Sequence, residues 1–325
     1  MNFDWNEVAF GSKKPLKDLQ AIFIIAPRQL SQARLKQLIK TYLPKGNILL
    51  GIAKEPFVDG FEDQPQFRML EQASIQRFVD QIGSSTSSNK LYTISYFQRN
   101  LPHVLEKLQF KHIVGINGSW RRSFHLRPEY YVLAQQKADY ELVSPFVDEL
   151  EAISYAADMD KLTSSTFDEL VKEKSVLTES EMINLAKASA RQSFDHSFQT
   201  GAVLGSKTPK GYKLLTTSYN RVVPYQTYAM LQGSEREKHF SPPNDMNFYD
   251  TVHAETMLLI NSLRQNIKLA DTTLFINLLP CPNCSRMLAE TDITEVVFEM
   301  DHSDGFAIEL LEKVGKIVRR ARTNS

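Results

Sequence analysis

Two stretches of the sequence decide the fold of its second half, TVHAET (residues 251–256) and LPCPNC (residues 279–284). Between them they offer one imidazole, that of His253, and two thiols, those of Cys281 and Cys284. Imidazole nitrogen and thiolate sulfur are ligands that zinc prefers, and a catalytic zinc takes three protein ligands and keeps its fourth position for water. The sequence therefore predicts a mononuclear Zn²⁺ site of the catalytic type, built from these three residues.

A carboxylate and two predicted helix starts complete this pattern. Apolar periodicity predicts one helix that begins at Val252 and another at Cys281–Thr291, so both cysteines fall in a first turn, where the helix dipole lowers a thiol pKa. Glu255 comes two positions after the histidine, where it can reach the water on the metal without being a ligand. An H-x-E motif followed by P-C-x-x-C, with these roles, is typical of zinc-dependent deaminases. The pattern thus predicts Glu255 as the catalytic acid–base group.

Two other interpretations fit the cysteine pair less well. A C-x-x-C pair can be a redox dithiol, but a redox motif does not require His-Ala-Glu at the start of the preceding helix. The pair can also be half of a structural zinc site, but such sites have four protein ligands, and the chain has only two cysteines. The combination of motifs favours the catalytic site over both.

The stretch from about Glu179 to Arg322 resembles the cytidine deaminase superfamily, and within it the deoxycytidylate deaminase branch. The matching segments, in chain order, are RQSFDHSFQTGAVL (191–204), TSYNRVVP (217–224), NFYDTVHAE (247–255), LFINLLPCPNC (274–284), Ile293–Phe298 and Leu310–Arg320. The family's Gly-Tyr-Asn-Gly-x-Pro turn is present with Ser218 and Arg221 in place of its two glycines. The resemblance implies an α/β/α sandwich with a mixed sheet for this half of the chain.

The order of the last elements separates two branches of this superfamily. After a strand at Glu295–Phe298 the sequence predicts a helix, Gly305–Val314, and a final strand, Lys316–Arg320. A strand–helix–strand crossover places its two strands parallel. A parallel final strand with a histidine ligand resembles the deoxycytidylate and tRNA-adenosine branches, whereas free-cytidine deaminases usually have a cysteine ligand and an antiparallel end. Cytidine itself is therefore the lesser candidate.

The resemblance implies hydrolytic deamination of a nucleotide base, in which a deoxycytidine nucleotide gives its deoxyuridine form and ammonia. It further implies that the Ala254 backbone N–H binds the ring carbonyl and that Asn220 binds the base or sugar, although asparagine also suits a left-handed turn. Alternatives are adenosine in RNA, a free guanine- or pterin-like base, and a non-catalytic nucleotide-binding module on the same fold. Glu255 argues against the last, because a binding module needs no catalytic glutamate.

The charge composition of the chain indicates which kind of molecule it binds. The 325-residue chain has 38 Lys and Arg against 38 Asp and Glu. It therefore lacks the broad positive electrostatic field that attracts long nucleic acids. This balance favours a small nucleotide substrate over a long nucleic acid. The N-terminus has no basic and apolar leader, and no stretch reaches the roughly 18 apolar residues of a membrane span. We therefore expect a cytoplasmic protein without a membrane segment, and a homo-oligomer by analogy alone.

The first half of the chain predicts a separate domain. Short apolar runs alternate there with amphipathic segments, which predicts a Rossmann-like parallel α/β domain. The runs are Ala21–Ala26, Asn47–Ile52, Leu91–Tyr96 and His112–Ile116. We expect three parts: this domain, with a regulatory or structural role, at residues 1–133; an acidic helical connector at 134–177; and the zinc-dependent deaminase domain at 178–325, opened by a capping box at Thr178–Glu181.

Four basic residues are candidate phosphate ligands. Arg236 and Lys238 lie in the long loop Tyr225–Asp250, which by resemblance closes over the nucleotide. Arg121 and Arg122 lie beyond a predicted parallel strand, where open sheets usually bind ligands. Neither a P-loop nor a dinucleotide fingerprint accompanies them. Surface charge without a ligand is the competing explanation for all four.

Overall fold

The structure is a computed structural model that describes residues 1–11, 20–25, 27–171, 176–242, 245, 247–301 and 304–322. The chain divides into two units. Unit 1 comprises Met1–Tyr155 and Thr227–Tyr249, and unit 2 comprises Ala156–Gln226 and Asp250–Ser325. We call Thr227–Tyr249 the insert, because it interrupts unit 2 in the sequence and belongs to unit 1.

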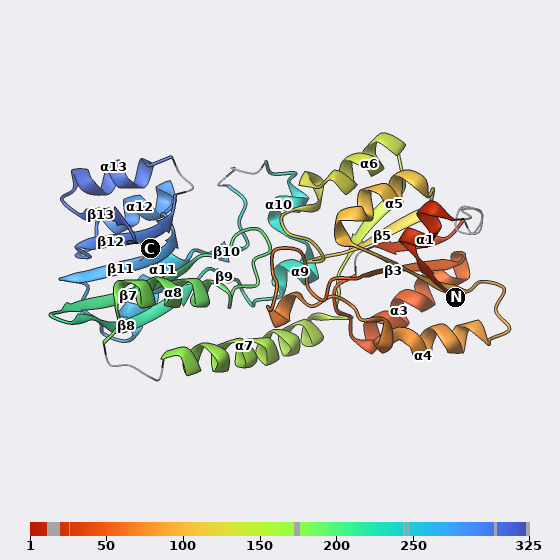
Figure 1. The fold of residues 1–325 in the computed structure, drawn as a ribbon, viewed down its shortest axis with the longest axis horizontal. Helices are drawn as coiled ribbons and strands as arrows, with labels where there is room; N and C mark the ends of the chain where they lie inside the picture. The colour runs from red at the N-terminus through yellow and green to blue at the C-terminus, as the bar shows by residue number, and fades with distance from the viewer. Residues whose placement is uncertain are drawn as a thin grey trace. The chain divides into compact units, whose positions relative to one another are not determined.

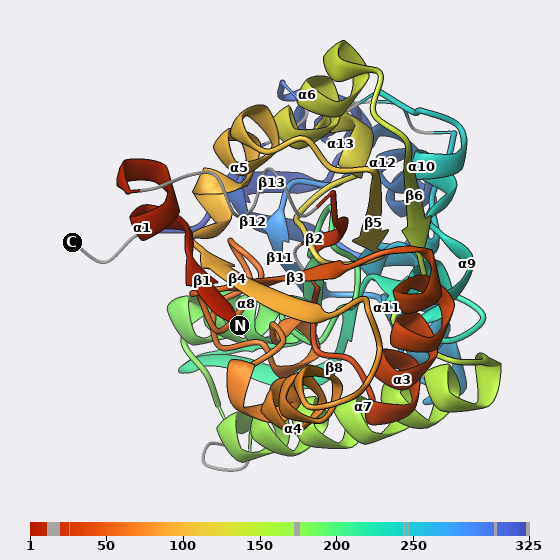
Figure 2. The same ribbon diagram turned by 90° about the vertical axis from the view of Figure 1, so that its right-hand side faces the viewer.

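Unit 1 is built on a six-stranded sheet in the order β1-β4-β3-β2-β5-β6 (Figure 2). The strands are β1 (Asn2–Asp4), β2 (Ile22–Ile25), β3 (Ile48–Ala53), β4 (Leu91–Tyr96), β5 (His112–Ile116) and β6 (Tyr140–Val143). Every neighbouring pair is parallel. The central strands β2 and β3 are buried along their whole length, as expected where helices cover both faces of a parallel sheet. The predicted Rossmann-like parallel domain is confirmed.

Helices cover both faces of this sheet. They are α1 (Trp5–Phe10), α3 (Gln32–Tyr42), α4 (Gln72–Gly83), α5 (Leu101–Lys107) and α6 (Pro128–Gln136), with α9 (Tyr228–Gln232) and α10 (Glu235–Lys238) in the insert. α3 and α4 lie on one face, and α5 and α6 lie on the other (Figures 1 and 2). On the first face, Leu35 and Ile75 from the two helices pack in one buried cluster with Ile24 and Leu50 of the central strands. This core forms because alternate residues of each strand point to the same face.

The insert completes unit 1. Asn117, which follows β5, donates its Nδ2 to the backbone carbonyl of Met230 in α9 at 3.2 Å. The Glu237 carboxylate in α10 accepts the backbone N–H of Phe124 at 2.5 Å. The insert is thus held by charge-assisted and amide hydrogen bonds at the loops that follow β5, the edge where parallel sheets usually bind ligands.

Unit 2 is built on a five-stranded mixed sheet in the order β13-β12-β11-β7-β8. The strands are β7 (Gly201–Thr208), β8 (Gly211–Tyr219), β11 (Thr272–Leu278), β12 (Glu295–Met300) and β13 (Ile317–Arg320). β7 is antiparallel to β8 and β11, whereas β11, β12 and β13 are parallel to one another. The predicted parallel final strand is confirmed, and the crossover through α13 (Phe306–Lys313) between β12 and β13 explains it.

The helices of unit 2 make it a three-layer sandwich. They are α8 (Glu179–Ala190), α11 (Ala254–Arg264), α12 (Pro282–Ala289) and α13 (Phe306–Lys313). α8 packs Met182 and Ala186 against Phe275 of β11. On the opposite face, α11, α12 and α13 pack against the alternate strand residues Leu274 and Ile276. The predicted α/β/α arrangement is therefore confirmed, with the capping box of Thr178 and Glu181 at the start of α8.

The segment expected as a helical connector, residues 134–177, contains more than helix. It holds the edge strand β6 as well as the long helix α7 (Glu149–Val171), and the boundary between the units falls inside that helix, after Tyr155. β6 has only four residues and none is fully buried, so it lacks the alternation that marks a strand in sequence. Within the described ranges, no helix combines the length and the apolar character needed to cross a membrane.

Candidate metal centre

His253 is placed by a short antiparallel pair of strands. β9 (Arg221–Val222) pairs with β10 (Thr251–Val252), and His253 follows directly as the N-cap of α11. Ser218 in β8 fixes the first turn of that helix, since its Oγ donates to the Ala254 carbonyl at 2.8 Å. The helix thus begins at Ala254, two residues after the start predicted at Val252.

The two thiols are placed by the start of α12. Cys281 is the N-cap residue, and its Sγ accepts the backbone N–H of Cys284 at 3.5 Å. Pro282 takes the first helical position, where its missing N–H costs nothing. Leu279, just before the helix, donates its N–H to the Met300 carbonyl at 2.8 Å and so ties this turn to β12. Both cysteines therefore lie in a helix first turn, as the sequence predicts.

The three side chains converge. His253 Nδ1 lies 3.5 Å from Cys281 Sγ and 3.4 Å from Cys284 Sγ. A tetrahedral zinc with ordinary Zn–S and Zn–N bond lengths separates such a nitrogen and sulfur by about 3.6 Å. In the part of the chain that the structure describes, these three form the one group of His, Cys, Asp or Glu side chains whose ligand atoms all lie within 4.8 Å of one another. The geometry therefore fits a zinc ion.

The charges of these side chains also favour a cation. The hydrogen bond with Cys284 lowers the pKa of Cys281 to about 4, while contact with Cys281 raises the pKa of Cys284. The hydrogen bond to Cys281 raises the pKa of His253. The opposite shifts of the two cysteines have one cause, because two adjacent thiolates repel each other. A divalent cation removes that repulsion and lets both act as thiolate ligands.

Glu255 lies beside the ligands and outside their group. Its side chain is 3% exposed, and its carboxyl is within hydrogen-bonding range of Cys284. Burial raises the pKa of Glu255, and the neighbouring His253 opposes this shift. A buried carboxyl with a raised pKa can hold a proton closer to neutral pH than an exposed one, which suits an acid–base group.

Asn220 is buried, and its side chain makes hydrogen bonds to other residues of unit 2. Its Oδ1 accepts the N–H of Thr200 at 2.8 Å, and its Nδ2 donates to Asp195 Oδ2 at 3.0 Å and to the Phe198 carbonyl at 2.9 Å. Asp195 itself accepts the N–H of Ser197 at 2.7 Å, a turn whose sequence signal is an Asp two positions before a Ser. The sequence analysis did not single out Asp195. These bonds give Asn220 a turn role, and its contact with a base or sugar stays a prediction.

The two departures from the family's turn have partners of their own. Ser218 Oγ contacts the Ala202 carbonyl at 3.4 Å in addition to its bond to Ala254. Arg221 Nη2 lies 4.0 Å from Asp160 Oδ2 in α7. The serine thus links β7, β8 and α11, and the arginine links β9 to α7.

The four predicted phosphate ligands all belong to unit 1. Arg236 is 5% exposed and donates to two backbone carbonyls of the insert at 3.2 and 2.6 Å, which gives it a structural role there. Lys238 pairs with Glu235 at 2.7 Å. Arg121 and Arg122 are exposed. Phosphate binding by all four stays a prediction.

Comparison with known proteins defines the class of unit 2. Residues 177–300 match the family model of the cytidine and deoxycytidylate deaminase zinc-binding region. This part of the chain therefore belongs to the cytidine deaminase superfamily. A Drosophila melanogaster protein named "Probable deoxycytidylate deaminase" is 25% identical over 113 residues, which is 35% of this chain and 54% of that protein. The match thus spans about half the length of this curated relative.

Two solved structures are similar over less than half of this chain. The dCMP deaminase of cyanophage S-TIM5 is 18% identical over 44% of this chain and 95% of its own, with a TM-score of 0.32. A guanine deaminase of Nitrosomonas europaea is 16% identical over 48% of this chain and 84% of its own, also with a TM-score of 0.32.

Proposed function

We propose that unit 2 is a zinc-dependent hydrolytic deaminase and that its substrate is a deoxycytidine nucleotide, which gives the deoxyuridine form and ammonia. One observation carries the activity: the buried carboxyl of Glu255 lies beside a three-ligand group that fits zinc. Three protein ligands are the number found in catalytic zinc sites, which keep a fourth position open.

Each residue of the site has a role in this reaction. His253, Cys281 and Cys284 hold the ion, and zinc, when bound, supplies Lewis-acid activation of water at neutral pH. Glu255 takes a proton from the water and delivers it to the ring nitrogen next to the amino-bearing carbon. The water oxygen bonds to that carbon. Glu255 then takes the second proton from this oxygen and delivers it to the amino nitrogen, so that the C–N bond breaks as the C=O bond forms and ammonia leaves.

The start of α11 supplies a binding group for the base. The Ala254 N–H belongs to the first turn, where backbone donors lack an intrahelical partner, so it can donate to the ring carbonyl. Asn220 lies in the loop network of Asp195 and Thr200, and we propose that it contacts the base or sugar when this loop adjusts to substrate.

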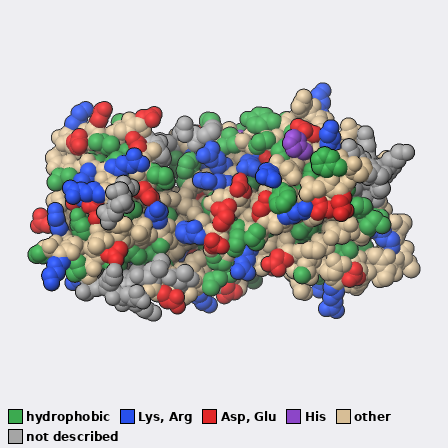
Figure 3. All heavy atoms as spheres, viewed as in Figure 1, with side chains coloured by type: hydrophobic (Ala, Val, Ile, Leu, Met, Phe, Trp, Pro, Cys, Tyr) green, Lys and Arg blue, Asp and Glu red, His purple; other side chains and the backbone are tan. Residues whose placement is uncertain are grey.

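Three observations support a deoxycytidine nucleotide as substrate. Histidine is the nitrogen ligand, β13 runs parallel to β12, and the curated relative bears the name of a deoxycytidylate deaminase. The equal numbers of basic and acidic residues favour a small substrate, and the face drawn in Figure 3 mixes the two charges. A homo-oligomer and a cytoplasmic location stay predictions.

The test is ammonia release by the zinc-loaded full chain over a panel of cytosine, adenine and guanine nucleosides, nucleotides and short RNAs. We expect the highest kcat/KM with deoxycytidine monophosphate. Glu255→Gln should lower kcat by roughly 10²- to 10⁴-fold, because the acid–base group is lost, while the zinc content stays unchanged. Glu309→Gln on the exposed side of α13 is the matched control and should keep wild-type activity.

The results of this panel decide both the substrate and the proposed activity. Ammonia release from RNA or guanine alone would replace the proposed substrate and keep the deaminase. No release from any substrate, or full activity in Glu255→Gln, would overturn the enzymatic proposal and leave a binding module.

A further inference from the structure

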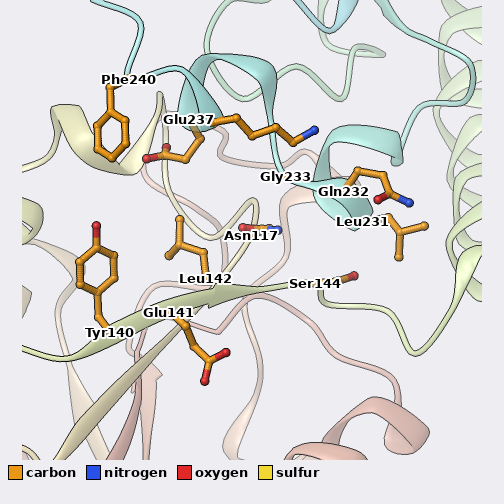
Figure 4. Close-up of a pocket in the computed structure, with 11 residues that line it drawn as sticks. Asn117, Tyr140, Glu141, Leu142, Ser144, Leu231, Gln232, Gly233, Glu237 and Phe240 are labelled. Atoms are coloured by element: carbon orange, nitrogen blue, oxygen red, sulfur yellow. The ribbon is translucent and has the colours of Figure 1, made fainter.

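We propose that unit 1 contains a second ligand site, a cavity of about 400 Å³ between β6 and the insert, and that it binds a neutral planar heterocycle such as a nucleobase or nucleoside (Figure 4). Its volume lies within the range of small-molecule sites, about 300 to 1,000 Å³. The site lies wholly within unit 1, so the proposal does not rest on the deaminase activity of unit 2.

The walls of this cavity come from two segments that are far apart in the sequence. Asn117 and Ser144 follow the carboxyl ends of β5 and β6, the edge at which parallel sheets usually bind ligands. Tyr140 and Leu142 share one face of β6, because strand residues two apart point the same way. The insert supplies the opposite wall, through residues 231–233, 237, 238 and 240.

Two aromatic rings favour a planar ligand. Tyr140 from β6 and Phe240 from the insert lie on the same side of the cavity (Figure 4). Phe240 is 58% exposed and its φ is +48°, in the left-handed region that bulky residues avoid. Such backbone strain is retained where the structure needs the residue in that place. A phenyl ring held open to solvent at the mouth of a cavity is a stacking surface for a heterocycle.

The charged side chains at the cavity already have hydrogen-bond or ion-pair partners, which favours a neutral ligand. The Glu141 carboxylate accepts from the Tyr42 hydroxyl at 3.0 Å, and its side chain points away from the cavity (Figure 4). Glu237 accepts two backbone N–H groups at 2.5 and 3.1 Å. The one cation of the lining, Lys238, pairs with Glu235 at 2.7 Å. No unpaired cation among the residues that line the cavity is available to hold a phosphate chain.

The cavity also has polar groups that can form hydrogen bonds with the edge of a planar ligand. Asn117 uses its Nδ2 on the Met230 carbonyl, so its side-chain oxygen is the atom that can accept from a ring N–H. Gln232 brings a second amide from the insert. Burial raises the pKa of Tyr140, so its hydroxyl stays protonated and can donate. A few such groups around apolar walls are typical of sites for small planar molecules.

The test is photo-crosslinking of the full chain with 4-thiouridine, followed by mass spectrometry of the modified peptides. We expect saturable adducts at Tyr140 or Phe240 that excess uridine removes. Phe240→Ala should weaken apparent binding about ten-fold, because stacking on one aromatic ring contributes strongly to base binding. Tyr131→Ala is the matched control, since Tyr131 is 60% exposed in the same unit and does not line the cavity.

A second variant distinguishes a loss of ligand binding from a loss of folding. Phe240→Gly removes the ring and suits the positive φ, so it should fold at least as well as wild type and still lose the adduct. Adducts of equal yield in Phe240→Ala, or no saturable adduct at either ring, would overturn the site. Stronger competition by uridine triphosphate than by uridine would overturn the neutral ligand class.

Discussion

Cys281 and Cys284 supply two of the three proposed zinc ligands, so substituting one of them tests the site directly. Cys281→Ser should reduce zinc from about one ion per chain to a small fraction, because a serine hydroxyl is a poor zinc ligand. It should also lower the thermal midpoint of unfolding, since the metal stabilises the folded state that binds it.

The control for this prediction lies between the two thiols. Asn283 is exposed and outside the ligand group, so Asn283→Ala should keep both zinc and the unfolding midpoint. Metal analysis and a thermal scan with and without a chelator check both variants. Full zinc retention in Cys281→Ser would show that the ion is held elsewhere.

The residues that hold the proposed zinc could be predicted from the sequence because their spacing is the signal. His253, Glu255 and the two cysteines sit at helix starts, where local sequence fixes their geometry. The residues that position Asn220 could not be predicted in the same way, because the partner Asp195 is 25 positions away. Ser218 posed the same problem, since a hydroxyl in a strand does not reveal that it will meet the Ala254 carbonyl.

An ion-pair cluster joins α8 to the strands β12 and β13 in unit 2. Arg319 in β13 donates to both Glu179 oxygens at 2.9 and 2.7 Å and to Glu295 at 2.7 Å. The hydrogen bond from Arg319 lowers the pKa of Glu179. A lowered folded-state pKa means that the stabilisation is present above the unfolded pKa of Glu179 and is lost as the pH falls through the folded-state value.

Glu179→Gln should therefore destabilise the protein in a pH-dependent way. We expect a loss of about 1 to 3 kcal/mol in the free energy of unfolding at pH 7, the usual size for hydrogen bonds to charged groups. The difference from wild type should shrink as the pH falls below the ordinary glutamate pKa of 4.5. Urea titrations at a series of pH values measure it.

A more exposed pair in the same unit is the control. Lys187 and Glu299 have side chains 49% and 31% exposed, so Glu299→Gln should cost less than about 1 kcal/mol. Equal losses for the two variants, or a Glu179→Gln loss that persists unchanged in acid, would contradict the assigned role of Glu179.

Long apolar elements could be predicted from the sequence, and short polar ones could not. The last two strands of unit 2 were expected at Glu295–Phe298 and Lys316–Arg320 and are observed at Glu295–Met300 and Ile317–Arg320. The first four residues of β12 are all buried, as in a strand that is covered on both faces. β1 and β6 have only three and four residues and lie at the edges of their sheet. Their backbone pairing depends on neighbours far along the chain, which leaves little trace in local composition.

At the scale of the whole chain, the insert is the feature that local sequence could not assign. The residues of unit 2 that flank the insert lie close together. Val222 pairs with Thr251, and the Val223 N–H donates to the Asp250 carbonyl at 3.0 Å. Joining Gln226 to Asp250 through a short glycine-rich linker should therefore leave unit 2 folded. We expect this deletion to retain zinc and to raise the amide hydrogen exchange of β5 and β6 in unit 1.

Hydrogen exchange with mass spectrometry, together with metal analysis, compares the deletion variant with the wild-type chain. Unchanged exchange in unit 1 would contradict the bonds from Asn117 and Glu237 to the insert as a source of its stability. Loss of zinc would show that unit 2 needs the insert for its fold. Replacing the insert by a linker of equal length separates the second outcome from simple strain at the junction.

The interrupted order of the chain also has a consequence during synthesis. Domains generally fold in the order in which the ribosome releases them, but unit 1 lacks its last segment until Tyr249 has been made, 94 residues after Tyr155. At translation rates of roughly 5 to 20 residues per second, this delay is about 5 to 19 seconds. For that time the nascent chain presents the edge strand β6 and the loop of Asn117 without their cover, so a chaperone that binds it then can decide the yield of folded protein.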